Sequence, residues 1–167
     1  MEIKGLKDEV IGDYKKTAMQ IIFPKCDFKC DKENGCNLCQ NSSLAQAPVI
    51  RMHAQDIVDR YLKNPLTKAF VFGGLEPFDS VADLLDLIFV IRGINECYDD
   101  IVIYTGYTEE ELLKLHPYTY RQIQTFSNIY VKFGRYIPNQ EPHFDEVLGI
   151  KLASDNQYGK RVGYEYI

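Results

Sequence analysis

Ala-Met-Gln-Ile-Ile-Phe-Pro-Lys-Cys, at residues 18–26, is a short apolar run that Pro24 stops and that leads directly into a cysteine-rich loop. A run of this length and composition is typical of a strand buried between parallel neighbours. Two more strands of this kind are predicted at residues 68–72 and 101–104, and a fourth at 129–133. The sequence therefore predicts a sheet whose second strand is broken after residue 72 by Gly73-Gly74 and whose third ends near Thr105.

Helical patterns separate these strands. Residues 54–62 place Ile57, Val58, Tyr61 and Leu62 on one face, and Ser80 is a candidate cap for a helix over residues 81–91. The sequence Thr108-Glu109-Glu110-Glu111 is a capping box, which predicts a helix that continues through Leu115. Strands that alternate with helices favour an α/β fold with a parallel sheet and a ligand site at the carboxyl ends of the strands.

The two ends of the chain give weaker signals. Residues 2–16 are polar and mixed, with a turn signal at Gly12-Asp13, and predict a short strand or hairpin at the edge of the sheet. Residues 135–160 contain two prolines and two glycines with little periodicity, which indicates a mostly irregular segment that could cover the site. We expect a final strand around residues 161–166.

Length and charge limit the possible functions. The chain has 167 residues, which suits one well-buried domain spanning residues 1–167. Its net charge of −5 and the absence of a basic run argue against nucleic acid or an anionic membrane as a partner. No apolar segment is long enough to cross a bilayer or to act as a signal peptide, so we expect a cytoplasmic protein.

Four of the five cysteines lie in the loop over residues 24–46, with the spacing C-x3-C-x5-C-x2-C. In a reducing compartment, clustered cysteines are metal ligands or redox groups more often than structural disulfides. If Cys26, Cys30, Cys36 and Cys39 all bind one metal, the site is a closed zinc or iron–sulfur centre. If only three bind a cluster, one iron keeps an open position that can hold a substrate.

A second motif, Gly73-Gly74-Leu75-Glu76-Pro77, follows the second predicted strand. Paired glycines let a ligand approach the backbone, and Glu76 offers a carboxylate that can accept hydrogen bonds from a ligand ammonium group. A closed zinc site would leave this motif without a purpose, so its combination with the cysteine loop favours the open cluster.

Together these motifs resemble the radical S-adenosylmethionine enzymes, and within them the activating proteins of anaerobic ribonucleoside-triphosphate reductase. That superfamily has a C-x3-C-x2-C loop after the first strand and a Gly-Gly-Glu-Pro motif after the second. The resemblance covers about residues 18–160. Further similar segments are, in chain order, Tyr104-Thr105-Gly106-Tyr107-Thr108, Gly134-Arg135-Tyr136 and Ala153-Ser154-Asp155-Asn156-Gln157.

The resemblance implies a partial (β/α) barrel, or an open, mostly parallel curved sheet with helices on its outer face. It implies a [4Fe–4S] cluster bound by Cys26, Cys30 and Cys39, because Cys39-Gln40-Asn41 is similar to the segment at the family's third cysteine. Eight residues separate Cys30 from Cys39 where the family has two, so Cys36 stays open as an alternative ligand. The implied contacts to S-adenosylmethionine are Gly73, Gly74, Glu76, Tyr104, Thr105, Lys132 and Asn156.

The implied activity is that of an activase. A reduced cluster transfers one electron to S-adenosylmethionine, which gives methionine and a deoxyadenosyl radical, and that radical removes a hydrogen atom from a glycine of the partner. The implied partners are a glycyl-radical enzyme, namely anaerobic ribonucleoside-triphosphate reductase, and an external one-electron donor. Two alternatives remain: a radical enzyme acting on a small molecule, as 7-carboxy-7-deazaguanine synthase does, and a non-enzymatic zinc or iron–sulfur binding module.

Overall fold

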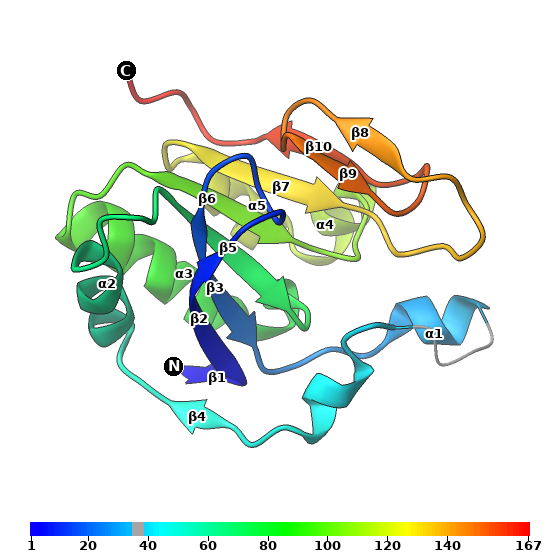
Figure 1. Ribbon diagram of the computed structural model, residues 1–167, viewed down its shortest axis with the longest axis horizontal. Coiled ribbons are helices and arrows are strands. Elements are labelled where there is room, and N and C mark those ends of the chain that lie inside the picture. The colour runs from blue at the N-terminus through cyan, green and yellow to red at the C-terminus, as the bar shows by residue number, and fades with distance from the viewer. Residues whose placement is uncertain (35–38) are drawn as a thin grey trace.

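A computed structural model describes residues 1–34 and 39–167, and its centre is a six-stranded sheet (Figure 1). The strand order is β10-β7-β6-β5-β3-β2. The four inner strands are parallel to one another, and the two outer strands run antiparallel to their neighbours. In order across the sheet, the strands are β10 (Tyr158–Arg161), β7 (Ile129–Phe133), β6 (Asp100–Tyr104), β5 (Ala69–Gly74), β3 (Ala18–Phe23) and β2 (Gly5–Val10).

Two small antiparallel pairs accompany this sheet: β1 (Glu2–Ile3) with β4 (Ile50–Arg51), and β8 (His143–Asp145) with β9 (Ile150–Leu152). The α-helices are α1 (Lys29–Asn34), α2 (Ala54–Leu62), α3 (Val81–Phe89), α4 (Glu109–Leu115) and α5 (Pro117–Gln124). Short 3₁₀ helices occupy Ser42–Gln46 and Pro77–Ser80, and a π-helical turn at Val90–Ile94 extends α3. Each described helix is too short or too polar to cross a bilayer.

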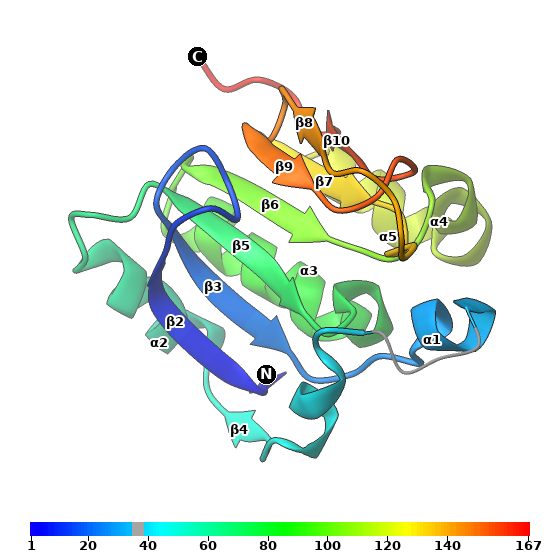
Figure 2. The same cartoon turned by 45° about the vertical axis from the view of Figure 1, so that its right-hand side comes forward.

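The two faces of the sheet have different coverings. One face carries the larger core, in which alternate residues of the inner strands pack against α2, α3, α4 and α5. Figure 2 shows these helices together behind the sheet, and the β8–β9 pair on the other side. The opposite face has a smaller core that includes Ala69, Val71, Val102, Tyr14 and Leu148. Among the described elements, α2, α3, α4 and α5 therefore cover one face of the sheet, and the β8–β9 pair lies on the other.

Most predicted elements are confirmed. The four inner strands form a mixed α/β fold with a mostly parallel sheet, and over the described residues the sheet does not close into a barrel. Helix α2 has the predicted bounds, and the capping box is present: Thr108 Oγ accepts from the Glu111 N–H, and Glu111 accepts from the Thr108 N–H. The predicted edge strand at residues 2–16 is β2, which pairs with β3.

Several local predictions were wrong. The side chain of Ser80 makes no capping hydrogen bond, and Leu62 is exposed because α2 turns it away from the sheet. Strand β5 continues through Gly74 instead of ending before Gly73, because both glycines still pair with β3. The final strand lies at 158–161 instead of 161–166. The segment 135–160, expected to be irregular, contains the β8–β9 pair, and the sequence analysis missed α1 and α5.

Candidate metal centre

A cavity of about 400 Å³ lies at the carboxyl ends of the parallel strands, as the topology predicts. Its lining includes the three described cysteines of the loop, Cys26, Cys30 and Cys39. It also includes glycines and polar side chains from the ends of β5, β6 and β7. The cavity therefore brings together the cysteine loop and the Gly-Gly-Leu-Glu-Pro motif, which are separated in the sequence by more than thirty residues.

The cysteine loop begins after β3, and its backbone has an unusual conformation at Phe28. Phe28 has a φ of +55°, a left-handed conformation that is costly for a bulky residue, and its N–H donates to Cys26 Sγ at 3.2 Å. Helix α1 then begins and carries Cys30. On the far side of the loop, the Cys39 N–H donates to Asp31 Oδ1 at 2.8 Å. Local backbone contacts thus orient two of the three cysteines.

Burial raises the pKa of both Cys26 and Cys30 in the metal-free chain. The pKa of Cys26 rises to about 12, although the Phe28 N–H opposes the shift. The pKa of Cys30 is raised as well, although the backbone of Tyr136 and the charges of Lys132 and Arg135 favour its thiolate. Both thiols must lose a proton when they bind a metal.

Glu76 is buried at the lip of the cavity, with 7% of its surface exposed. Its carboxylate accepts three hydrogen bonds, from the Phe78 N–H at 3.1 Å, the Thr105 hydroxyl at 2.9 Å and the Gly106 N–H at 2.9 Å. Burial nevertheless raises its pKa to about 7, against the effect of these donors. Its own N–H donates to the Lys25 carbonyl at 2.7 Å, which ties this motif to the start of the cysteine loop.

Three glycines keep side chains out of this wall. A Cβ on Gly74, which has a φ of +79°, would lie 2.4 Å from Ile22 Cγ2. A Cβ on Gly106 would lie 3.9 Å from Cys30 Sγ and 3.7 Å from Glu76 Oε2, so this glycine sits between a predicted cluster ligand and the buried carboxylate. Gly73 lines the cavity beside Tyr104. The result is a wall of backbone that a ligand can approach closely.

The other predicted contact residues differ in position. Tyr104, Thr105 and Lys132 line the cavity. Lys132 is buried and donates to the Gly134 carbonyl at 2.8 Å, and burial lowers its pKa to about 8 despite the charges of Cys30 and Glu76. Asn156 does not line the cavity; its amide donates to the Arg135 carbonyl at 2.8 Å, and Gln157 lines the cavity instead.

The donor set at this site suits an iron–sulfur cluster. Thiolates are soft ligands that favour iron–sulfur clusters and zinc, and three of them line a cavity large enough for a small molecule as well. The prediction that Cys36 is a spare or alternative ligand falls on residues 35–38, outside the described part of the chain. Asp27 and Asp79 place carboxylate oxygens within 4.8 Å of Cys26 Sγ and of each other, so hard ligands adjoin one end of the thiol group.

Two further residues that line the cavity, Gln20 and Arg135, were not predicted as site residues. Gln20, on β3, lines the cavity beside Asp13, to which its amide donates at 3.3 Å. Gln20 is the one polar residue in the apolar run at residues 18–23, and this position could have marked it as a residue that faces the site. Arg135 was noted only as part of a similar turn, yet its guanidinium reaches two carboxylates around the loop.

Comparison with known proteins gives one family. The chain matches the family described as the 4Fe-4S single cluster domain over residues 16–151, which include every cysteine of the loop. No curated protein and no solved structure matched the chain. This family supports a 4Fe-4S cluster as the group that the cysteine cavity holds, and such a domain is consistent with a redox enzyme. The chain belongs to the 4Fe-4S single cluster domain family.

Proposed function

We propose that this protein is a radical S-adenosylmethionine activase that produces a glycyl radical on an anaerobic ribonucleoside-triphosphate reductase. The observation that carries the proposal is the meeting of three thiols, the Gly73-Gly74 backbone and the buried Glu76 carboxylate in one cavity. Cluster binding alone needs only the thiols. A buried carboxylate beside them is what a second, cationic ligand would require.

In this proposal Cys26, Cys30 and Cys39 would hold the cluster as its three thiolate ligands, which would leave one iron without a protein ligand, and Glu76 lines the same cavity. When bound, the reduced cluster supplies one electron to S-adenosylmethionine, whose cleavage gives methionine and a deoxyadenosyl radical that takes a hydrogen atom from the partner's glycine. An external donor supplies the electron.

The side chains of the cavity bind and orient the cosubstrate. Glu76 accepts hydrogen bonds from the ammonium group, and a positive charge there returns its raised pKa toward the ordinary value. Gly73 and Gly74 offer open backbone, while Tyr104, Thr105 and Lys132 supply further polar contacts. Asn156 contributes indirectly, because its amide donates to the Arg135 carbonyl and so holds the backbone of that turn.

The first test is anaerobic reconstitution with iron and sulfide, followed by reduction in the presence of S-adenosylmethionine. We expect a brown protein that forms 5′-deoxyadenosine and methionine, and Glu76→Gln should form much less of both. Glu110→Gln, which changes an exposed carboxylate on α4, is the matched control. A colourless protein with stoichiometric zinc would contradict the proposal and favour a binding module.

The second test adds an anaerobic ribonucleoside-triphosphate reductase as the protein substrate. We expect the doublet of a glycyl radical in the electron paramagnetic resonance spectrum, together with one deoxyadenosine for each radical formed. If deoxyadenosine forms but a competent reductase gains no radical, the activase is wrong and the small-molecule alternative gains support.

A further inference from the structure

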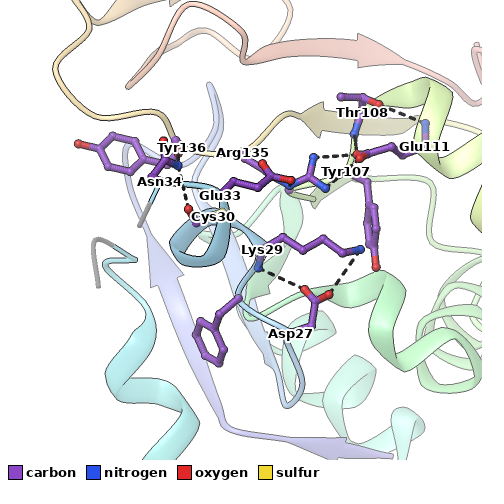
Figure 3. A network of polar contacts seen from close by, with 12 residues as sticks. Asp27, Lys29, Cys30, Glu33, Asn34, Tyr107, Thr108, Glu111, Arg135 and Tyr136 are labelled. Carbon is purple, nitrogen blue, oxygen red and sulfur yellow. Dashed lines mark hydrogen bonds and ion pairs between the residues drawn. The ribbon is translucent and has the colours of Figure 1, made fainter. Parts of the chain in front are cut away.

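Helix α1 carries Cys30 but buries none of its six residues. A helix this short is unstable by itself, and hydrophobic packing does not hold this one in place. Its position must therefore come from polar contacts with the rest of the protein. Among the polar contacts of α1 within the described residues, three reach the turns after β6 and β7, and two of these involve the turn Gly134-Arg135-Tyr136 that follows β7 (Figure 3).

The first of these contacts passes through Arg135, whose surface is 9% exposed. Its guanidinium forms two parallel hydrogen bonds with Glu111, at 2.8 and 2.9 Å. Glu111 is itself fixed, because one of its oxygens also accepts the Thr108 N–H in the capping box of α4. On its other side, Arg135 Nε forms an ion pair with Glu33 Oε1, on α1, at 3.3 Å, without the geometry of a hydrogen bond. The bidentate geometry orients the guanidinium so that one edge faces α1.

Two further contacts accompany this ion-pair chain. The Asn34 amide donates to the Cys30 carbonyl at 2.8 Å and reaches the Tyr136 carbonyl at 3.5 Å. At the other end of α1, Lys29 Nζ lies 3.9 Å from the centre of the Tyr107 ring, within the range of a cation–π interaction. Both link α1 to the turns after β6 and β7.

We infer that Arg135 is a positioning residue: the ion-pair chain Glu111–Arg135–Glu33 fixes α1, and with it Cys30, against the cavity. Removal of either the Arg135–Glu33 or the Arg135–Glu111 ion pair should make α1 open more often, while the sheet stays intact. The inference rests on the proposed cluster site only for its effect on iron, because the position of α1 can be measured in the metal-free protein.

The test is amide hydrogen exchange of the full-length, metal-free protein, followed by mass spectrometry of peptides covering α1 and α3. Glu33→Gln should speed exchange in α1 by about two- to fivefold, the size expected for a half-exposed ion pair, and leave α3 unchanged. Arg135→Ala should have a larger effect of about tenfold, because it also leaves Glu111 without its bidentate partner. Arg135→Lys, which keeps the charge but not the fork, should lie between wild type and Arg135→Ala.

Two controls separate positioning from general stability. Glu110→Gln removes the neighbouring carboxylate, for which the described residues show no ion pair, and should change neither helix. Raising the ionic strength from about 0.05 to about 0.5 M should speed α1 exchange in wild type but have little effect in Glu33→Gln, because salt screens the ion pair that the variant lacks. Equal exchange in wild type and Glu33→Gln, or faster exchange in α3 as well as α1, would overturn the inference.

The second readout is the rate at which the reconstituted protein loses iron to a chelator under anaerobic conditions. We expect Glu33→Gln and Arg135→Ala to lose iron faster than wild type, in the same order as their α1 exchange. Looser α1 with unchanged iron loss would overturn the role of Arg135 in holding Cys30 for the cluster. If wild type assembles no cluster, the proposed function fails, and hydrogen exchange still decides whether Arg135 positions α1.

Discussion

Replacing Glu76 with glutamine should change how the stability of the metal-free protein depends on pH. The folded carboxyl has a pKa raised to about 7 by burial, from an ordinary value of 4.5. Between pH 4.5 and about 7, the Glu76 carboxyl is therefore protonated in the folded protein but ionised in the unfolded chain. The wild-type protein therefore loses stability as the pH rises through this window, whereas glutamine cannot titrate.

The size of this effect follows from the two pKa values. Each pKa unit corresponds to about 1.4 kcal/mol, and most of the window lies between pH 5 and pH 8, so Glu76 removes about 2.5 kcal/mol from the free energy of unfolding over that range. The amide also replaces one acceptor oxygen with a group that cannot accept the Gly106 N–H or the Thr105 hydroxyl. That loss costs about 1–3 kcal/mol at both pH values and cancels from the comparison.

The assay is urea unfolding of wild type, Glu76→Gln and the control Glu110→Gln at pH 5 and at pH 8. We expect the stability of Glu76→Gln relative to wild type to rise by about 2–3 kcal/mol between the two pH values, and that of Glu110→Gln to stay constant. Parallel pH dependences of wild type and Glu76→Gln would refute the reasoning, because Glu76 would then have an ordinary pKa in the folded protein.

Three further predictions concern the cluster, the cavity wall and the buried arginine. Cys39→Ala should lose the iron of the reconstituted protein while Cys36→Ala keeps it, as measured by iron content; the opposite result would make Cys36 the third ligand. Gly74→Ala should lower the free energy of unfolding by about 2–4 kcal/mol, because its Cβ would collide with Ile22. Gly12 also has a positive φ but open space around it, so Gly12→Ala should lower the free energy of unfolding by only about 1 kcal/mol. Equal losses of stability in the two variants would exclude the collision. Arg92 is buried and donates to the carbonyls of Ser127, Cys97 and Asp99. Arg92→Met should therefore lower the free energy of unfolding by about 2–4 kcal/mol in the same urea assay. A loss below about 1 kcal/mol would show that water replaces these hydrogen bonds.

The sheet and the position of the site could be predicted because they depend on local patterns. Each inner strand is a short apolar run between a helix and a turn, and the Thr108–Glu111 capping box marks the start of α4 directly. Parallel strands place their carboxyl ends at one edge, so the cysteine loop and Glu76 had to meet there. No contact between distant residues was needed for these predictions.

The remaining features depend on contacts between distant segments. Helix α1 has no apolar face, so its sequence gives no periodic signal, and its position depends on Arg135, about one hundred residues away. The β8–β9 pair is short, and each strand buries only its last residue, Asp145 or Leu152. The raised pKa of Glu76 likewise results from burial by the folded chain, which no motif records.

Along each inner strand, residues alternate between the helix-covered core and the cavity side. In β7, Val131 and Phe133 enter the core while Lys132 lines the cavity; in β6, Ile103 enters the core while Tyr104 lines the cavity. Insertion of one residue within such a strand would exchange the two sets and bury a lysine among apolar side chains. A one-residue change in the length of an inner strand is therefore costly, whereas a change in a loop leaves this alternation in place. Cys30 and Cys39 both come after the end of β3 and before the start of β4 in the sequence, so added residues between them leave the register of the six-stranded sheet intact.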